Sequence, residues 1–268
     1  MNMKERLIKI LNYIEEHGSA TTLELTSLFD VSEMTIRRDL ILLEKEDKIL
    51  RFHGGASIKN RPRQESAFDI RIKTNYEVKC EIAAEAARYL EDLTESGQVH
   101  SVFMGGGSTM FCMAECICDH LSATVITDNL YVSSVLAKNP SNSVIMLGGQ
   151  IVLPSLNVVG FTAEKMIADF SYDYCFIGSS AIDEAGNLYA YTLLEAGVFS
   201  AAMASARHTV VLADHSKLGI KNLIQIARFS KDFTLITDRQ APRDLLKTYE
   251  SLGTEILLAE SAEIKGMA

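Results

Sequence analysis

The stretch VSEMTIRRDLILLEKEDKILRFHGGA, residues 31–56, decides how the beginning of the chain folds. Its apolar residues Ile36, Leu40 and Leu43 recur at the spacing of one helix face. Ser32 precedes this pattern, and serine is a preferred N-cap because its hydroxyl accepts a hydrogen bond from a free amide of the first turn. The pattern therefore predicts a helix that opens at Ser32.

Two further helical patterns precede this helix. The first runs from about residue 3 and stops at His17 and Gly18, a typical C-terminal signal. The second covers residues 23–29, and the short turn 30–32 separates it from the helix described above. Helix, tight turn and helix in this order are typical of a helix-turn-helix, whose second helix enters the major groove of DNA.

Basic residues lie where such a fold would need them. Arg37 and Arg38 occupy the exposed and flanking faces of the predicted third helix, near its start. Residues 49–56 alternate and then break at two glycines, which predicts a β-hairpin wing carrying Arg51 and His53. An isolated Arg-Arg pair on a helix is usually a solvated surface. Within a pattern of three helices and a wing, the same pair favours DNA binding.

The segment 31–56 closely resembles the winged helix-turn-helix signature of DeoR-type bacterial transcriptional regulators, above all in TIRRDL at 35–40 and HGGA at 53–56. The resemblance implies operator DNA as a partner. The positions indicated for DNA contact are Ser32, Met34, Thr35, Arg37, Arg38, Arg51 and His53. Asp39 is expected to orient an arginine or to cap the helix locally, because a carboxylate and a phosphate repel each other.

Composition limits the kind of protein. The 268 residues are 47% apolar and 23% charged, and no run approaches the roughly 20 apolar residues of a membrane span. The first residues lack the apolar core of an export signal, and five cysteines, an odd count, suit a reducing compartment. We therefore expect a soluble cytoplasmic protein without a membrane partner.

Charge is divided unevenly along the chain. Residues 1–63 carry 11 basic and 10 acidic side chains, whereas residues 64–268 carry 15 and 25. The net charge of -9 therefore comes from the larger part and does not argue against DNA binding by the smaller one. The polar stretch 57–68, with Pro62, predicts a linker. We expect a winged helix-turn-helix over 1–57, a linker over 58–75 and an α/β domain over 76–268.

The larger part alternates short apolar strands with helical segments. The strands are VHSVFM, ATVIT, SVIML, YCFIG, TVVLA and FTLIT, a rhythm that predicts an α/β domain with a largely parallel sheet. In such sheets ligands bind beyond the carboxyl ends of the strands. Small and polar residues cluster at five of these ends, namely 105–109, 127–129, 148–149, 178–180 and 214–217. The first cluster, GGGST, leads into a helix, and such turns bind anions through backbone amides.

The resemblance to DeoR-type regulators extends over this part, in VITDNL, FIGSSAID and LADHSKLG among other segments. It implies a Rossmann-like fold similar to ribose-phosphate isomerase and a phosphorylated sugar as effector. The positions that it implies for effector binding are Gly107, Ser108, Thr109, Thr127, Asn129, Gly148, Asp183 and Lys217. We expect a repressor of a carbohydrate-use operon that forms a homo-oligomer, dimer or tetramer, to read repeated half-sites.

Three positions depart from the family pattern. Gly105 stands where the family commonly has aspartate, Phe199 where it has lysine, and Gly106 where it has serine. An isomerase needs a base for a carbon-bound proton, so these departures favour a binding protein over an enzyme. Two other functions stay open: a sensor domain that only oligomerises the protein, and a sugar-phosphate isomerase attached to a DNA-binding module. A glycine-rich turn without a ligand is the plain structural alternative.

Two other groups contain residue types used in chemistry. Cys112, Cys116 and His120 recur on one helix face, but the first and last lie about 12 Å apart along a helix, too far to share a metal ion. Residues 214–216, Asp-His-Ser, contain the members of a hydrolase triad, yet neighbours in a chain seldom converge in that geometry. We expect no catalytic residues, no metal and no cofactor.

Overall fold

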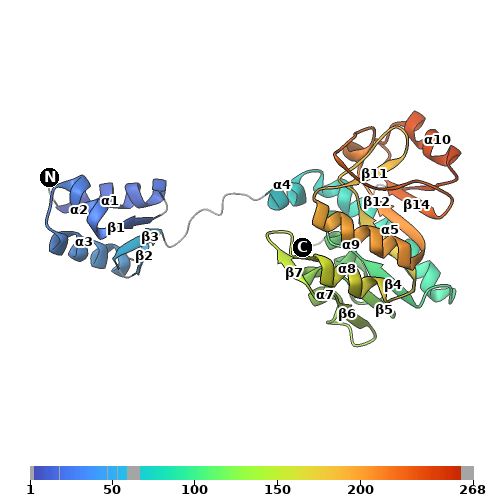
Figure 1. The fold of residues 1–268 in the computed structure, drawn as a ribbon, viewed down its shortest axis with the longest axis horizontal. Coiled ribbons are helices and arrows are strands. Elements are labelled where there is room, and N and C mark those ends of the chain that lie inside the picture. Colours follow the sequence, from blue (N-terminus) through green and yellow to red (C-terminus); the bar gives the residue numbers. More distant parts are fainter. Residues whose placement is uncertain (1–2, 18, 47, 53, 59–66, 261–268) are drawn as a thin grey trace. The chain divides into compact units, whose positions relative to one another are not determined.

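The computed structural model divides the chain between residues 66 and 67 into two units, which we describe one by one (Figure 1). The residues that it describes are 3–17, 19–46, 48–52, 54–58 and 67–260. His53, a predicted DNA contact, lies outside them. None of the helices within these ranges is long and apolar enough to span a membrane.

The first unit combines three helices with a small antiparallel sheet. The helices are α1 (Met3–His17), α2 (Thr22–Phe29) and α3 (Glu33–Lys45), and the strands are β1 (Ser19–Thr21), β2 (Ile49–Phe52) and β3 (Gly55–Ile58). Strand β3 lies between the other two. The predicted three helices and hairpin wing are confirmed. Strand β1 was not predicted, because three residues are too few to show a period.

The starts of the two helices in the helix-turn-helix are capped by side chains. Ser32 precedes α3, and its hydroxyl oxygen accepts from the backbone N–H of Thr35 at 3.3 Å. At α2 the Thr21 hydroxyl accepts from the Glu24 amide, and the Glu24 carboxylate accepts from the Thr21 amide. This reciprocal arrangement satisfies two amides that a helix start leaves without partners. Both helices therefore begin where the sequence places a cap.

A buried core joins the three helices. Ile36, Leu40 and Leu43 of α3 are at most 2% exposed, and they belong to one apolar cluster with Ile14 of α1 and Leu25 of α2. The face of α3 that was predicted to be apolar is the buried one. The opposite face is consequently turned outward.

Asp39 is a buried carboxylate on α3 that pairs with Arg6 of α1. Its two oxygens accept hydrogen bonds from the Arg6 guanidinium at 2.5 and 3.2 Å. The Asp39 side chain is 3% exposed and that of Arg6 is 12% exposed. The hydrogen bond to Asp39 raises the pKa of Arg6. Asp39 thus orients an arginine, as expected, and it ties α1 to α3.

The second unit is built on a seven-stranded sheet in which every neighbouring pair is parallel. In spatial order the strands are β15 (Glu255–Leu258), β14 (Phe233–Thr237), β12 (Ala206–Leu212), β9 (Tyr172–Gly178), β4 (Ser101–Met104), β5 (Thr124–Thr127) and β6 (Ser143–Met146). Six of them are the predicted strands, and β15 was not predicted. The predicted α/β fold with a parallel sheet is confirmed.

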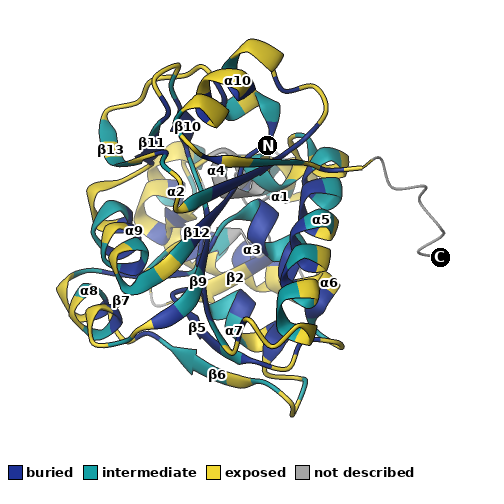
Figure 2. Cartoon of the chain, turned by 90° about the vertical axis from the view of Figure 1, so that its right-hand side faces the viewer, coloured by how far each residue is buried: buried dark blue, intermediate teal, exposed yellow. Residues whose placement is uncertain are grey.

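Helices cover both faces of this sheet (Figure 2). One face packs against α5 (Tyr76–Glu95), α6 (Ser108–Ile117) and α7 (Leu130–Leu136). The other packs against α8 (Phe161–Ala168), α9 (Leu193–Ser205) and α10 (Arg243–Ser251). The two layers bury the sheet from both sides and leave its strand ends for ligand binding.

Two small antiparallel sheets complete this unit. One has the order β10 (Ala181–Ile182), β11 (Asn187–Ala190) and β13 (Ile224–Arg228), and the other pairs β7 (Gln150–Val152) with β8 (Asn157–Val159). Neither was predicted, because these short strands lack the longer apolar runs that indicated the strands of the main sheet.

Helix α4 (Ala67–Lys73) lies inside the segment 58–75 that we predicted as a linker. It groups with the second unit, so the described elements leave only residues 59–66 between β3 and α4. The chain over 67–73 is helical where we predicted a linker. Seven residues make only two turns, which is too short a stretch for the apolar period of a helix to be read.

Asp39→Ala should destabilise the first unit by about 2 kcal/mol, because it leaves the partly buried Arg6 guanidinium without its charged acceptor. Glu33→Ala is the control, since it removes the exposed partner of Arg37, an ion pair worth at most about 1 kcal/mol. Hydrogen exchange of α1 and α3 amides, measured by mass spectrometry on the full chain, compares the two variants. Equal losses of protection would contradict a stabilising role of the Arg6–Asp39 pair.

Candidate DNA-contacting surface and anion-binding pocket

The exposed face of α3 presents the residues predicted to contact DNA. Met34 is 61% exposed, Arg37 and Arg38 are exposed, and Thr35 is half-buried. The hydroxyl oxygens of Ser32 and Thr35 lie 2.9 Å apart at the start of the helix. All five positions lie at the N-terminal end of α3, the part of such a helix that reaches base edges.

The three exposed arginines among the described residues of this unit differ in their partners. Arg37 Nη2 donates to Glu33 Oε1 at 2.6 Å, and Arg51 Nε lies 3.7 Å from Glu44 Oε2. Within the described part of the chain, Arg38 has no ion-pair partner. Exposed ion pairs are weak, so a phosphate can replace either carboxylate at little cost. Arg38 can therefore bind a phosphate without giving up an ion pair to a described residue.

A pocket of about 250 Å³ lies at the carboxyl ends of β4, β9 and β12. Residues from three of the predicted clusters line it: 106–109, 178–180 and, from the cluster 214–217, Asp214, Ser216 and Lys217. Helices α4, α5 and α9 and the residues after β11 contribute further walls. Three strand ends that are far apart in the sequence therefore form one site.

The wall formed by residues 106–109 offers backbone donors. Among the described residues no side chain caps the start of α6, so the amides of its first turn lack a side-chain acceptor. Gly107 has φ 140°, a conformation that a residue with a Cβ rarely adopts. Gly107, Ser108 and Thr109 all line the pocket, and the helix N-terminus adds partial positive charge. The structure thus brings together the residues predicted to hold an anion.

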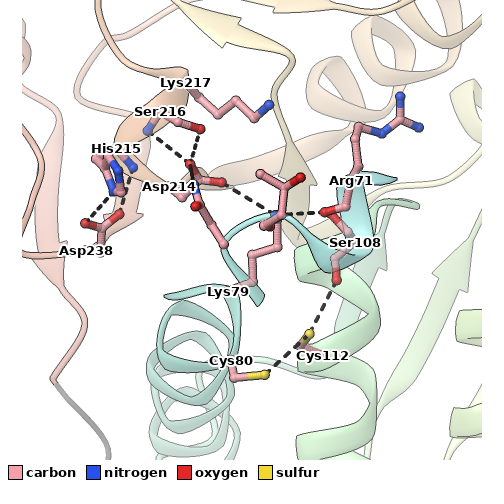
Figure 3. A network of polar contacts seen from close by, with 12 residues as sticks. Arg71, Lys79, Cys80, Ser108, Cys112, Asp214, His215, Ser216, Lys217 and Asp238 are labelled. Atoms are coloured by element: carbon pink, nitrogen blue, oxygen red, sulfur yellow. Dashed lines mark hydrogen bonds and ion pairs between the residues drawn. The ribbon is translucent and has the colours of Figure 1, made fainter. Parts of the chain in front are cut away.

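Lys79 on α5 is a buried cation in the pocket wall (Figure 3). Its side chain is 5% exposed, and Nζ donates to the backbone carbonyl oxygens of Arg71 and Thr74. Nζ also lies 3.9 Å from Asp214 Oδ2, whose side chain is 2% exposed. Burial lowers the pKa of Lys79, while the charge of Asp214 opposes this effect. The pocket wall therefore contains a buried ion pair.

Two further cations meet at Tyr191. Arg71 Cζ lies 4.4 Å from the centroid of the tyrosine ring, and Lys217 Nζ donates to the tyrosine hydroxyl at 3.3 Å. All three residues line the pocket. Together with Lys79, these two residues give the pocket three cations, compared with the two carboxylates of Asp214 and Glu195. The excess of positive charge favours an anionic ligand.

Residues 214–216 do not assemble a hydrolase triad. The amide and hydroxyl of Ser216 donate to Asp214, whereas His215 Nδ1 lies 2.9 Å from Asp238 Oδ1. Burial raises the pKa of Asp214, but the hydrogen bond from Ser216 and nearby positive charge lower it below its ordinary value. Serine and histidine thus face different carboxylates, so His215 is not placed as the base for Ser216.

Three of the predicted effector positions, which lie at or after the ends of β5 and β6, do not line the pocket. Thr127 and Asn129 are completely buried, and both serve internal hydrogen bonds. The Thr127 hydroxyl donates to a backbone carbonyl of β4, and Asn129 Nδ2 donates to Asn157 Oδ1 at 2.7 Å. Gly148 is exposed in the turn between β6 and β7. None of the three lines the pocket, although Asn129 supports Asn157, which does.

Asp183, the fourth such position, also lies outside the pocket lining. It closes the turn between β10 and β11, where its carboxylate accepts from the Asn187 amide and from the Tyr189 hydroxyl at 2.8 Å. Burial raises the pKa of Asp183, but hydrogen bonds from Asn187 and Tyr189 outweigh burial and lower it. Its side chain is used to build the turn.

The sequence reasoning missed the pocket residues from α4 to α5, namely Arg71, Thr74 and Lys79. The first two lie in the segment predicted as a linker. Lys79 had a readable signal, because it shares a helix face with Ile82 and Ala86 of the predicted apolar stripe. A lysine on a buried stripe requires a partner and therefore points to a polar site.

The departures from the family pattern have close neighbours in the pocket. A Cβ at Gly105 would lie 3.1 Å from Phe199 Cε1 and 3.5 Å from Ile177 Cγ2. Phe199 is 7% exposed and lines the pocket. A Cβ at Gly106 would overlap the side-chain amide of Asn157. An aromatic ring and an amide therefore occupy the space beside these two glycines.

The cysteines do not gather into a metal site. Cys80 Sγ and Cys112 Sγ lie 3.9 Å apart between α5 and α6. Burial and the neighbouring thiols raise the pKa of Cys112 to about 12, so it stays a neutral thiol. In the described ranges no three or more side chains of histidine, cysteine, aspartate or glutamate are placed to hold a metal ion.

Asp128, directly after β5, is a fully buried carboxyl group close to the Gly106 backbone. Neither of its carboxyl oxygens has a hydrogen-bond partner among the described residues. Burial raises the pKa of Asp128 to about 7. The folded protein therefore keeps this group protonated in mildly acidic solution.

Both units match models of one protein family. Residues 6–61 match the DeoR-like helix-turn-helix domain, and residues 74–239 match the DeoR C-terminal sensor domain. The chain belongs to the DeoR family. As a DeoR-family protein it is a helix-turn-helix transcriptional regulator with a sensor domain, which confirms the predicted family and the predicted regulatory function.

Relatives of this DeoR-family regulator match it over nearly the whole chain. It is 31% identical to the transcriptional repressor CsqR of Escherichia coli (strain K12), over 94% of each chain. It is 30% identical to the repressor GlcR of Bacillus subtilis (strain 168), over 99% of this chain and 100% of that one. The glycerol-3-phosphate regulon repressor of Haemophilus influenzae is 30% identical, over 96% and 98%. A ribose 5-phosphate isomerase A from Methanocaldococcus jannaschii matches at 18% identity and a TM-score of 0.38, over 56% and 57%.

Asp128→Asn should remove a pH dependence of stability. Between about pH 4 and pH 7 the unfolded chain loses the Asp128 proton while the folded chain retains it, so the wild type loses stability as the pH rises. The stability of the variant relative to the wild type should therefore grow over this interval and level off above about pH 7. Urea unfolding followed by circular dichroism at several pH values measures the difference. A difference that stays constant would show that Asp128 does not titrate there.

Proposed function

We propose that this DeoR-family regulator represses transcription by binding operator DNA through the N-terminal end of α3, and that a phosphorylated sugar in the pocket modulates this binding. The observation that carries the proposal is the pocket, where uncapped amides of α6 lie with Arg71, Lys79 and Lys217. Phosphate binds to such donors. A volume of about 250 Å³ suits a small polar ligand, and one relative is named for the glycerol-3-phosphate regulon.

We propose that the pocket binds its ligand without turnover. The carboxylates that line it in the described chain, Glu195 and Asp214, are both engaged. Glu195 accepts hydrogen bonds from Asn157 and Thr192, and Asp214 pairs with Lys79. A general base must be available to the proton that it removes. The engaged carboxylates therefore support binding over isomerisation.

We further propose that the protein acts in the cytoplasm as a homo-oligomer, dimer or tetramer. One winged helix contacts little DNA, and two units related by symmetry reach two half-sites at once. Four candidate DNA contacts at the start of α3 are exposed, namely Ser32, Met34, Arg37 and Arg38, which is consistent with such an arrangement.

Lys217→Ala should weaken binding of a sugar phosphate roughly tenfold, because it removes one charge-assisted hydrogen bond. The full chain is heated with glycerol 3-phosphate, ribose 5-phosphate, glucose 6-phosphate or inorganic phosphate, and a ligand bound by the folded state raises the unfolding midpoint. Lys221→Ala, an exposed lysine outside the pocket lining, is the control and should behave as the wild type. No rise at millimolar ligand would favour a unit that only oligomerises, and conversion of a sugar phosphate would indicate an isomerase.

Arg38→Ala should weaken binding to a duplex that the full chain selects from a random-sequence pool. If Arg38 contacts a phosphate, the slope of binding against salt should fall by about one counterion; if it contacts a base, sequence preference should relax. Arg88→Ala, which removes an exposed arginine of the second unit, is the charge-matched control. Identical isotherms for Arg38→Ala and the wild type over a range of salt would place Arg38 outside the interface.

A further inference from the structure

Helix α4 is both the first described element of the second unit and a wall of its pocket. It covers Ala67–Lys73 and follows residues 59–66, which join it to β3 of the first unit. Arg71 on this helix and Thr74 directly after it line the pocket. The element that is nearest in the chain to the helix-turn-helix unit therefore forms part of the ligand site.

Polar contacts hold the end of α4 to the rest of the second unit (Figure 3). Lys79 Nζ donates to the backbone carbonyls of Arg71, at 2.9 Å, and of Thr74. Carbonyls at the end of a helix lack intrahelical partners, so Lys79 serves as their donor. Asn75, in the turn after α4, donates to Asp214 at 3.2 Å, and Asp214 faces Lys79 at 3.9 Å. The end of α4 is thus fixed by residues that also line the pocket or support it.

Arg71 and Lys217 bring charge to the same ring from different elements. Arg71 belongs to α4 and lies over the Tyr191 ring, while Lys217 belongs to the turn η1 (His215–Lys217) after β12 and donates to the Tyr191 hydroxyl. An anion in the pocket attracts both cations. Arg71 lies on the described element that is nearest in the chain to the first unit, whereas Lys217 follows a strand of the central sheet.

We propose that Arg71 binds the anionic ligand and that α4 thereby transmits the occupancy of the pocket to the DNA-binding unit. This inference rests on the proposed function, because it requires a phosphorylated sugar in the pocket. A charge-assisted hydrogen bond to phosphate is stronger than a cation–π contact at a partly exposed ring, so the ligand draws the guanidinium from Tyr191. A ligand changes DNA affinity only through its preference for one of two arrangements. Here the two arrangements differ in the position of α4.

Arg71→Ala and Lys217→Ala form a matched pair for the test, because each removes one pocket cation that contacts Tyr191. The affinity of the full chain for the selected duplex is measured without sugar phosphate and at saturation. The sugar phosphate used is the one among the four probes that raises the wild-type unfolding midpoint most. Both variants should bind it about tenfold more weakly. At saturation Lys217→Ala should keep the wild-type ratio of the two DNA affinities, and Arg71→Ala should bring that ratio close to one.

Equal ratios in the two variants at saturation would overturn the inference. Arg71→Gln serves as a second variant if Arg71→Ala does not fold, and unfolding midpoints without ligand decide this. A second measurement needs no DNA: the ligand should slow amide hydrogen exchange in α4 of the wild type and leave it unchanged in the Arg71 variant.

The failure of the inference differs from the failure of the proposed function. A raised wild-type midpoint with unchanged exchange in α4 would overturn the inference and leave the proposed ligand site standing. An unchanged midpoint with all four probes would overturn both.

Discussion

The arrangement of the second unit depends on the charged and hydrogen-bonding partners of one buried ammonium group, that of Lys79. Burying a lysine costs several kcal/mol unless opposite charge and hydrogen-bond acceptors surround it. Lys79 meets this requirement with the carboxylate of Asp214, which follows β12, and with the last carbonyls around α4. Because these partners come from separate elements, one charge joins a surface helix to the central sheet. The pocket lies where they meet.

Two departures from the family pattern lie side by side at the pocket. Gly105 and Phe199 replace an aspartate and a lysine of that pattern, and the ring of Phe199 lies against the glycine. The Phe199 ring occupies the space beside Gly105. Because both charged residues of the family pattern are replaced together, neither charge stays there without the other. Positive charge comes instead from Arg71, Lys79 and Lys217, together with the amides at the start of α6. The two replaced positions thus lie in contact, and the pocket wall still contains cations and backbone amides.

Sequence patterns predicted the elements with a clear apolar pattern. Helical spacing of apolar residues predicted the buried face of α3, and short apolar runs predicted six strands of the sheet. These patterns missed β1, which has only three residues, α4, which makes only two turns, and β15 at the edge of the sheet. In the site, residues of the clusters after β4, β9 and β12 line the pocket, since these strands are neighbours. The clusters at the ends of β5 and β6 contribute no lining residue, a difference that the alternation of strands and helices could not show because it does not give strand order. Both strands lie on the outer side of β4, so Thr127 and Gly148 end away from the pocket.

The close approach of Asn157 to Gly106 makes the size of one residue depend on the position of the other. The Asn157 side chain occupies the volume that any Cβ at position 106 would need, and Asn129 holds that side chain in place through a hydrogen bond of 2.7 Å. A serine at position 106, as in the family pattern, is compatible with this backbone only after residue 157 has become smaller or has turned away. Glycine at 106 and the present position of the Asn157 side chain are therefore coupled.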